Sequence, residues 1–240
     1  MRKVLASLLV VGVLSVSLVG ATKALFSDTE ASEDNRFVAG QIDLKVDYDG
    51  YYNKEVDGEP DIHWEMTDLN EDQKFFDFDD IKPGDYGEGT ISLHLTSNPA
   101  WVRAVIDDVH NDENGCTEPE ASDSGDTTCD DPGYGQGELA QNLHFRIWED
   151  DGDNVLEEGE TVVLEGTAAD ILAGASWDMG QVQPDQTIYY GVEWWVPAEV
   201  GNIIQTDSLT ADITFEAEQV RHNPTPSWNT TPTPTPTGTP

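Results

Sequence analysis

The sequence contains few basic residues. Lys and Arg number 11 against 48 Asp and Glu in 240 residues, a formal net charge of −37 at pH 7. Nucleic acids and anionic membranes are bound through Lys and Arg, so both are poor partners for this chain. Such an excess of one charge repels itself at low ionic strength and favours a protein that works in high salt or with abundant divalent cations. We take a halophilic source as a hypothesis.

Motifs of common enzymes are also missing. The histidines form no His-Glu-x-x-His or His-x-His spacing, which disfavours a zinc hydrolase. There is no Gly-x-Ser-x-Gly elbow, and no glycine-rich loop that would hold a phosphate. Carboxylate pairs such as Asp107 and Asp108 select nothing in a chain with 48 acids. We therefore predict a protein that is not an enzyme.

The only two cysteines, Cys116 and Cys129, lie in one polar segment. They form no Cys-x-x-Cys motif, and without neighbouring histidines they do not make a zinc site. Two such cysteines pair with each other or with another chain. We predict that they pair within the chain and close a loop of about 14 residues, which stabilises the fold by about 3 kcal/mol.

A long apolar run occurs only near the N-terminus. Two basic residues precede the run Val4–Val19, and small residues follow it up to Ala24. This order is typical of a secretory signal peptide, and the run is short for a membrane span of about 20 residues. We predict a signal peptide at residues 1–24, cleaved after Ala24 or Ala21, with an uncleaved anchor as the alternative. The protein is then extracellular or on the cell surface, and only its leader enters the membrane.

The C-terminal residues alternate Thr and Pro, which predicts an extended, solvated tail at residues 223–240. Within the tail, Asn229-Thr230-Thr231 fits the acceptor pattern for N-glycosylation. Between leader and tail we expect a mature N-terminal segment at residues 25–40 and a folded domain at residues 41–222.

Apolar and polar residues alternate along several segments, the pattern of half-buried strands. The clearest segments are 42–48, 91–96, 101–106, 143–147, 188–196 and 209–217. Residues 75–78 and 162–164 are shorter candidates, and only residues 167–175 have a helical pattern. Turns such as Lys82-Pro83-Gly84-Asp85 separate the segments, which favours hairpins over crossover helices. We predict an all-β fold: a two-sheet antiparallel jelly-roll sandwich with one short helix and an acidic loop insertion.

The acidic loop, Glu149–Glu160, has oxygen-bearing residues at the spacing of a calcium-binding loop. Glu149 in first position departs from the usual Asp, and Asn154 replaces the usual Gly but tolerates the left-handed conformation. We predict a calcium site there, with a solvated acidic turn as the alternative. The expected ligands are Glu149, Asp151, Asp153, the Val155 carbonyl and Glu160.

Large aromatic residues stand on both faces of one predicted strand, at Tyr189, Tyr190, Trp194 and Trp195. Core packing explains one face. The other face fits either a sugar-binding platform or a contact between subunits.

Three segments carry a resemblance to a known family. The most specific is Ala24-Leu25-Phe26-Ser27-Asp28 followed by Asn35-x-Phe37-x-Ala39-Gly40-x-Ile42-Asp43-Leu44. The others are Phe78 to Asp85 and Leu209 to Glu218. With these segments the chain resembles the TasA/camelysin family of secreted biofilm-fibre proteins, which includes archaeal bundling-pilus subunits. The middle, with both cysteines and Gly137-Glu138-Leu139, resembles archaeal members.

The resemblance implies a jelly-roll subunit that a dedicated signal peptidase processes and that polymerises outside the cell by donor-strand complementation. The mature N-terminal segment of one copy fills a gap in the sheet of the next, so copies join head to tail. Leu25, Phe26, Phe37 and Val38 are the apolar candidates for this donor strand. The alternatives are that the segment pairs within its own subunit, or that the chain is a monomeric, surface-tethered binding domain for glycan or calcium.

Overall fold

A computed structural model describes residues 41–53, 59–123, 125–172 and 174–229. All of these residues belong to one compact unit of the chain, within residues 40–240. The predicted leader and the donor-strand residues Leu25, Phe26, Phe37 and Val38 lie outside the described residues. Within the described part, no helix has the length and apolar character needed to cross a membrane.

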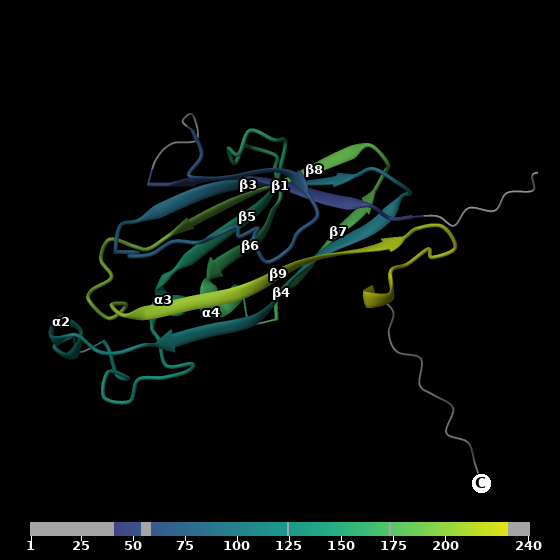
Figure 1. Ribbon diagram of the computed structural model, residues 1–240. Helices are drawn as coiled ribbons and strands as arrows, with labels where there is room; N and C mark the ends of the chain where they lie inside the picture. Colours follow the sequence, from purple (N-terminus) through teal and green to yellow (C-terminus); the bar gives the residue numbers. More distant parts are fainter. Residues whose placement is uncertain (1–40, 54–58, 124, 173, 230–240) are drawn as a thin grey trace, which may run out of the picture. The chain divides into compact units, whose positions relative to one another are not determined.

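Two antiparallel sheets pack face to face (Figure 1). The larger sheet has the order β2-β1-β3-β8-β5-β6, and the smaller has the order β7-β4-β9. The strands are β1 (Leu44–Tyr52), β2 (Ile62–Thr67), β3 (Tyr86–Leu95), β4 (Ala100–Glu113), β5 (His144–Asp150), β6 (Val162–Thr167), β7 (Ser176–Val182), β8 (Gln186–Trp195) and β9 (Asp207–Gln219). The chain passes between the sheets after β3, β4, β6, β7 and β8. The predicted two-sheet antiparallel sandwich is confirmed.

Helices are short and lie in the connections. The predicted helix at residues 167–175 is a single turn, α4 (Ala168–Ile171), whose N-cap Thr167 accepts a hydrogen bond from the Asp170 amide at 3.3 Å. Two further single turns, α2 (Glu118–Ala121) and α3 (Leu139–Asn142), and the 3-10 turn η1 (Ser227–Asn229) were not expected from the sequence pattern.

The alternating patterns of the six clearest segments, and that of residues 162–164, all fall on strands. The two strands that were not predicted, β2 and β7, each form one edge of a sheet and bury few side chains. An edge strand with little burial has no need of a strict alternation, so its sequence carries a weak signal.

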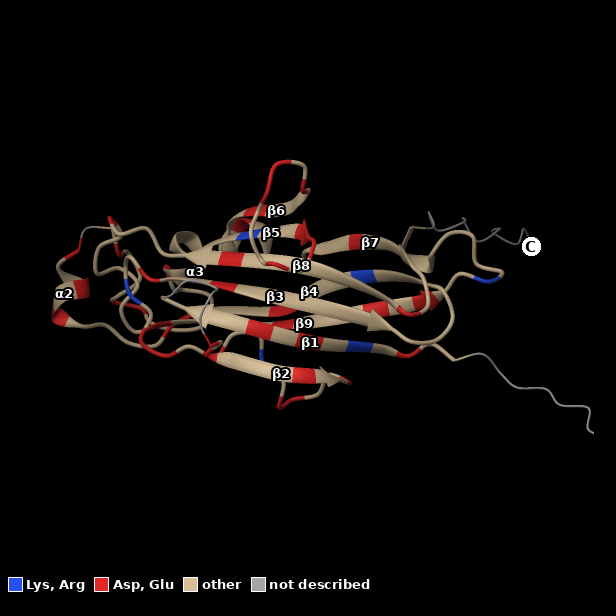
Figure 2. Ribbon diagram, turned by 90° about the horizontal axis from the view of Figure 1, so that it is seen from above, with Lys and Arg blue, Asp and Glu red and all other residues tan. Residues whose placement is uncertain are grey.

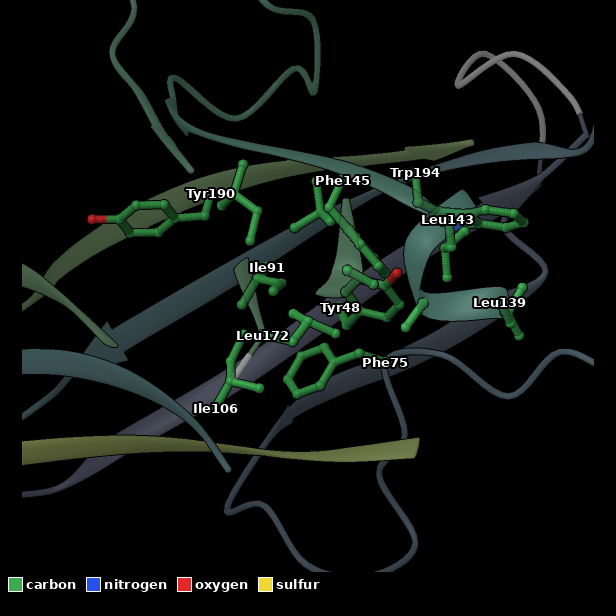
Figure 3. Close-up of a cluster of buried hydrophobic side chains, with 14 of the residues drawn as sticks. Tyr48, Phe75, Ile91, Ile106, Leu139, Leu143, Phe145, Leu172, Tyr190 and Trp194 are labelled. Carbon is green, nitrogen blue, oxygen red and sulfur yellow. The ribbon is translucent and has the colours of Figure 1, made fainter. Parts of the chain in front are cut away.

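The main core lies between the sheets and is rich in aromatic residues (Figure 3). Tyr48 and Trp194 are 1% and 2% exposed, and both come from the larger sheet. Opposite them, β4 contributes Ile106 to this core, and Val102 and Ala104 of the same strand are also buried. Burial of alternate residues along β4 and β8 accounts for the period-2 pattern of their sequences.

The predicted strand at residues 75–78 is wrong, because this segment is part of the loop between β2 and β3. The Phe75 ring lies 5.2 Å from Tyr48 in β1 and 6.1 Å from Phe215 in β9, so it contacts both sheets. Phe76 and Phe78 also pack inward, with ring centroids 5.8 Å from Phe145 and 5.2 Å from Trp194. The loop is therefore apolar for the same reason as a strand, since it closes the space between sheets of unequal width.

We expect Phe75→Ala to lower the free energy of unfolding by about 3–5 kcal/mol, because it leaves a cavity where one ring contacts both sheets. Tyr134→Ala is the matched control, since this side chain is 69% exposed, and its effect should stay within about 0.5 kcal/mol. Denaturant unfolding of both variants measures the difference. A loss below about 1 kcal/mol for Phe75→Ala would show that the loop does not contribute to the core.

Candidate functional site

The acidic loop joins β5 to β6 and carries several acidic segments (Figure 2). Asp150, Asp151 and Glu160 each offer a carboxylate oxygen within 4.8 Å of the others. Asp150 shapes the turn, because its Oδ2 accepts hydrogen bonds from the amides of Gly152 at 2.9 Å and Asn154 at 3.1 Å. Its Oδ1 accepts a hydrogen bond from the indole of Trp148 at 3.1 Å.

The structure brings together two of the predicted calcium ligands, Asp151 and Glu160. Glu149 belongs to β5 and Asp153 accepts a hydrogen bond from the Val155 amide at 3.0 Å, and neither is part of this group. The sequence analysis missed the third member, Asp150. An Asp two residues before a Gly is a common turn signal that would have pointed to it.

Other features of the acidic loop bear on the calcium prediction. Asn154 has a φ of 58°, as expected for a residue that replaces glycine in the turn. Its side chain is 3% exposed, and neither amide atom finds a hydrogen-bond partner among the described residues. Val155 and Leu156 are 51% and 38% exposed, so they do not anchor the loop in the core. The calcium site stays a prediction.

The cysteines and histidines have local partners. Cys116 and Cys129 lie at disulfide-bonding distance with their Cα atoms 5.2 Å apart. His94 lies between the carboxylate of Asp47, at 2.6 Å, and the hydroxyl of Thr187, at 2.9 Å.

The aromatic strand β8 has different partners on its two faces. Tyr190 and Trp194 are buried in the core. On the outer face, Trp195 stacks on His144 at 5.1 Å, and the Arg146 guanidinium lies 5.5 Å from the Trp195 ring centroid. Local sheet-surface contacts therefore occupy Trp195.

The outer edge of β9 is the longest edge of the smaller sheet. Among the described residues, β9 pairs along one side only, with β4, from Glu113 opposite Asp207 to Ala100 opposite Gln219. Its inward apolar residues are only partly buried, whereas those of β4 are buried. Those β9 residues are Leu209, Ile213, Phe215 and Ala217.

Residues 223–229, the start of the predicted tail, have contacts with the smaller sheet. The Trp101 indole donates a hydrogen bond to the Asn223 carbonyl at 2.9 Å, and the Arg103 guanidinium lies 4.8 Å from the Trp228 ring centroid. The amide of the proposed glycosylation residue, Asn229, donates a hydrogen bond to Asp178 at 2.7 Å. Glycosylation of Asn229 stays a prediction.

No protein-family model matches the chain. Comparison with curated proteins likewise finds no match. The resemblance to the TasA/camelysin family therefore rests on the sequence motifs alone.

Terbium luminescence tests the acidic loop, because terbium replaces calcium and the Trp148 indole lies beside Asp150. We expect Asp151→Asn combined with Glu160→Gln to weaken sensitised terbium binding by at least about tenfold, the loss that follows removal of even an indirect ligand contact. The matched control is Glu158→Gln, an exposed carboxylate of the same loop. Equal terbium emission from both variants would show that the acidic loop is not a calcium site.

Proposed function

We propose that the chain is an exported structural subunit that polymerises into extracellular filaments, a pilus or biofilm matrix fibre, by donor-strand complementation. Residues 25–40 of one copy add a strand along the outer edge of β9 in the next copy. The copies join head to tail, and because such a contact does not close on itself, it propagates into a filament.

The observation that carries the proposal is the one-sided pairing of β9 among the described residues. An edge strand presents a row of backbone N–H and C=O groups that an added strand can pair with. Partial burial of the β9 side chains Ile213 and Phe215 leaves apolar surface that such a strand would cover.

The donor segment fits this edge in length and composition. Its 16 residues span up to about 53 Å when extended, and the 13 residues of β9 span about 43 Å. Phe37 and Val38 lie at its C-terminal end, beside the start of the folded domain, and Leu25 and Phe26 lie at the new N-terminus. A free terminus that carries two large apolar residues gains stability when a neighbour buries them.

Charge sets the conditions for assembly. Without the leader the chain has 8 basic and 48 acidic residues, a formal charge of −40. Each docking event brings two such chains together, and the donor segment itself is acidic from Ser27 to Asp34. Assembly therefore requires screening by high salt or neutralisation by calcium.

Deleting residues 25–38 tests the proposal. We expect the intact mature chain to form filaments of uniform width in high salt, and the deletion variant to stay monomeric with an unchanged β-rich circular dichroism spectrum. Electron microscopy and sedimentation measure the two states.

Point variants sharpen the test. Phe37→Asp combined with Val38→Asp should abolish assembly, because a charge cannot enter an apolar pocket without a partner. Ser32→Ala, at a polar position of the same segment, should assemble normally. Filaments that persist without residues 25–38 would contradict the donor role, and monomers under all salt conditions would favour the surface-tethered binding domain.

A further inference from the structure

A second group of carboxylates lies at the end of the smaller sheet, where β4 ends and β9 begins. These residues come from five places in the chain: the last residue of β4, α2, the loop after α2, the residue before α3, and the first residue of β9. They are Glu113, Glu120, Asp126, Glu138 and Asp207. We call them the β4–β9 carboxylate cluster, and several acidic segments surround α2 nearby (Figure 2).

The cluster centres on two acids that face each other across a strand pair. Glu113 and Asp207 are direct partners in the β4–β9 ladder, and Glu113 is 2% exposed. Glu138 joins them, and the three residues offer carboxylate oxygens within 4.8 Å of one another. Like charges directly opposite each other destabilise a sheet, so this arrangement is unfavourable without a counter-charge.

Glu120 provides a second observation that points to a ligand-binding site: a buried oxygen without a hydrogen-bond partner. Its side chain is fully buried, and its Oε1 has no hydrogen-bond partner among the described residues. The Thr206 hydroxyl lies 2.9 Å from Glu113 Oε1 and 3.3 Å from Glu120 Oε2, so the two carboxylates lie next to the same single donor. The amide of Thr117 also donates to Glu120 Oε2, at 2.9 Å, which leaves Oε1 free.

Asp207 and Asp126 also use one oxygen for the backbone and leave one over, whereas both oxygens of Glu138 lie near the Thr128 hydroxyl, at 2.9 and 3.2 Å. Asp207 Oδ2 accepts hydrogen bonds from the amides of Glu138 and Leu139, at 2.6 and 2.7 Å. Asp126 Oδ1 accepts hydrogen bonds from the amides of Thr128 and Cys129, both at 2.9 Å. The buried oxygens without a partner are Glu113 Oε2, Glu120 Oε1, Asp126 Oδ2 and Asp207 Oδ1.

Nothing in the described part of the chain neutralises this charge. None of the five carboxylates forms a salt bridge with a described Lys, Arg or His. Burial, with repulsion from neighbouring carboxylates, raises the pKa values of Glu120 and Glu138, and raises the pKa of Asp207 to about 7. Buried charges without partners are costly, and a bound cation removes that cost.

We propose that the β4–β9 carboxylate cluster is a calcium-binding site. Glu113, Glu138 and Asp207 form one group of close carboxylates, and Glu120 and Asp126 belong to a neighbouring group. Both groups include buried oxygens without a hydrogen-bond partner. Calcium takes six to eight oxygen ligands and binds Asp and Glu carboxylates through one or both oxygens. Magnesium keeps several waters and uses one or two carboxylates, so it fits this all-protein cage poorly. Zinc prefers thiolates, and the neighbouring Cys116 and Cys129 are joined to each other.

Calcium bound at this cluster would link three parts of the molecule: the connection between β4 and α3, the end of β4 and the start of β9. Glu120 and Asp126 lie in the connection between β4 and α3, which the disulfide also constrains. Glu113 and Asp207 are paired with each other at the ends of β4 and β9. An ion bound at the cluster would therefore link that connection to these two strand ends. The site therefore orders the end of the proposed assembly edge, but it does not depend on filament formation.

Thermal unfolding of the purified chain at constant high salt tests the proposal. The salt already screens the surface charges, so an added divalent cation has little further non-specific effect on the Tm. We expect calcium at 100-fold excess over its Kd to raise the Tm by about 5–10 °C, and equal magnesium to raise it far less. Glu113→Gln combined with Asp207→Asn should abolish this calcium shift. In EDTA the same variant should melt at or above the wild-type temperature, because two repelling charges are gone.

Three controls separate this site from the acidic loop and from loss of folding. Asp151→Asn with Glu160→Gln should keep the shift that belongs to the cluster. Glu118→Gln, an exposed carboxylate of α2, should keep the full shift. Glu120→Gln alone should reduce the shift if the double variant does not fold. A wild-type chain without a calcium-specific shift, or cluster variants that retain it in full, would overturn the proposal.

Discussion

The unequal width of the two sheets is the constraint on which the rest of the structure depends. Six strands present an apolar face that three strands must cover. The loop between β2 and β3 supplies part of the cover, since Phe75 contacts both Tyr48 and Phe215. The outer edge of β9 has no such cover among the described residues. β9 is a long strand whose side chains are only partly buried. In our proposal a strand from another copy completes the smaller sheet there, so an incomplete sandwich becomes the means of assembly.

Negative charge is the second constraint, and it acts on the same part of the molecule. Most acidic residues lie at the surface, where solvent and salt screen them. The β4–β9 carboxylate cluster differs, because Glu113 and Glu120 are buried and keep oxygens without partners. A calcium ion there would neutralise the cluster at the start of β9. Export, high salt and calcium would then favour the same state, a folded domain with an ordered edge.

The sequence predicted those parts of the fold that have a local signal. Alternation identified strands such as β8, because Tyr190, Val192 and Trp194 bury one face. Phe75 misled the prediction, since apolar residues also fill a loop that closes the core. The acidic loop was identified by spacing, although Asp150 was missed. No regular spacing in the sequence identifies the β4–β9 carboxylate cluster. Glu113 and Asp207 are far apart in the chain and meet only because β4 pairs with β9.

Hydrogen exchange of the β9 amides, compared between monomer and filament, tests the central claim most directly. If β9 is the acceptor edge, alternate amides between Asp207 and Gln219 exchange rapidly in the monomer, because β4 protects only one side. In the filament those same amides should become strongly protected. Unchanged exchange along β9 in filaments, with new protection at β2 or β6 instead, would contradict the account.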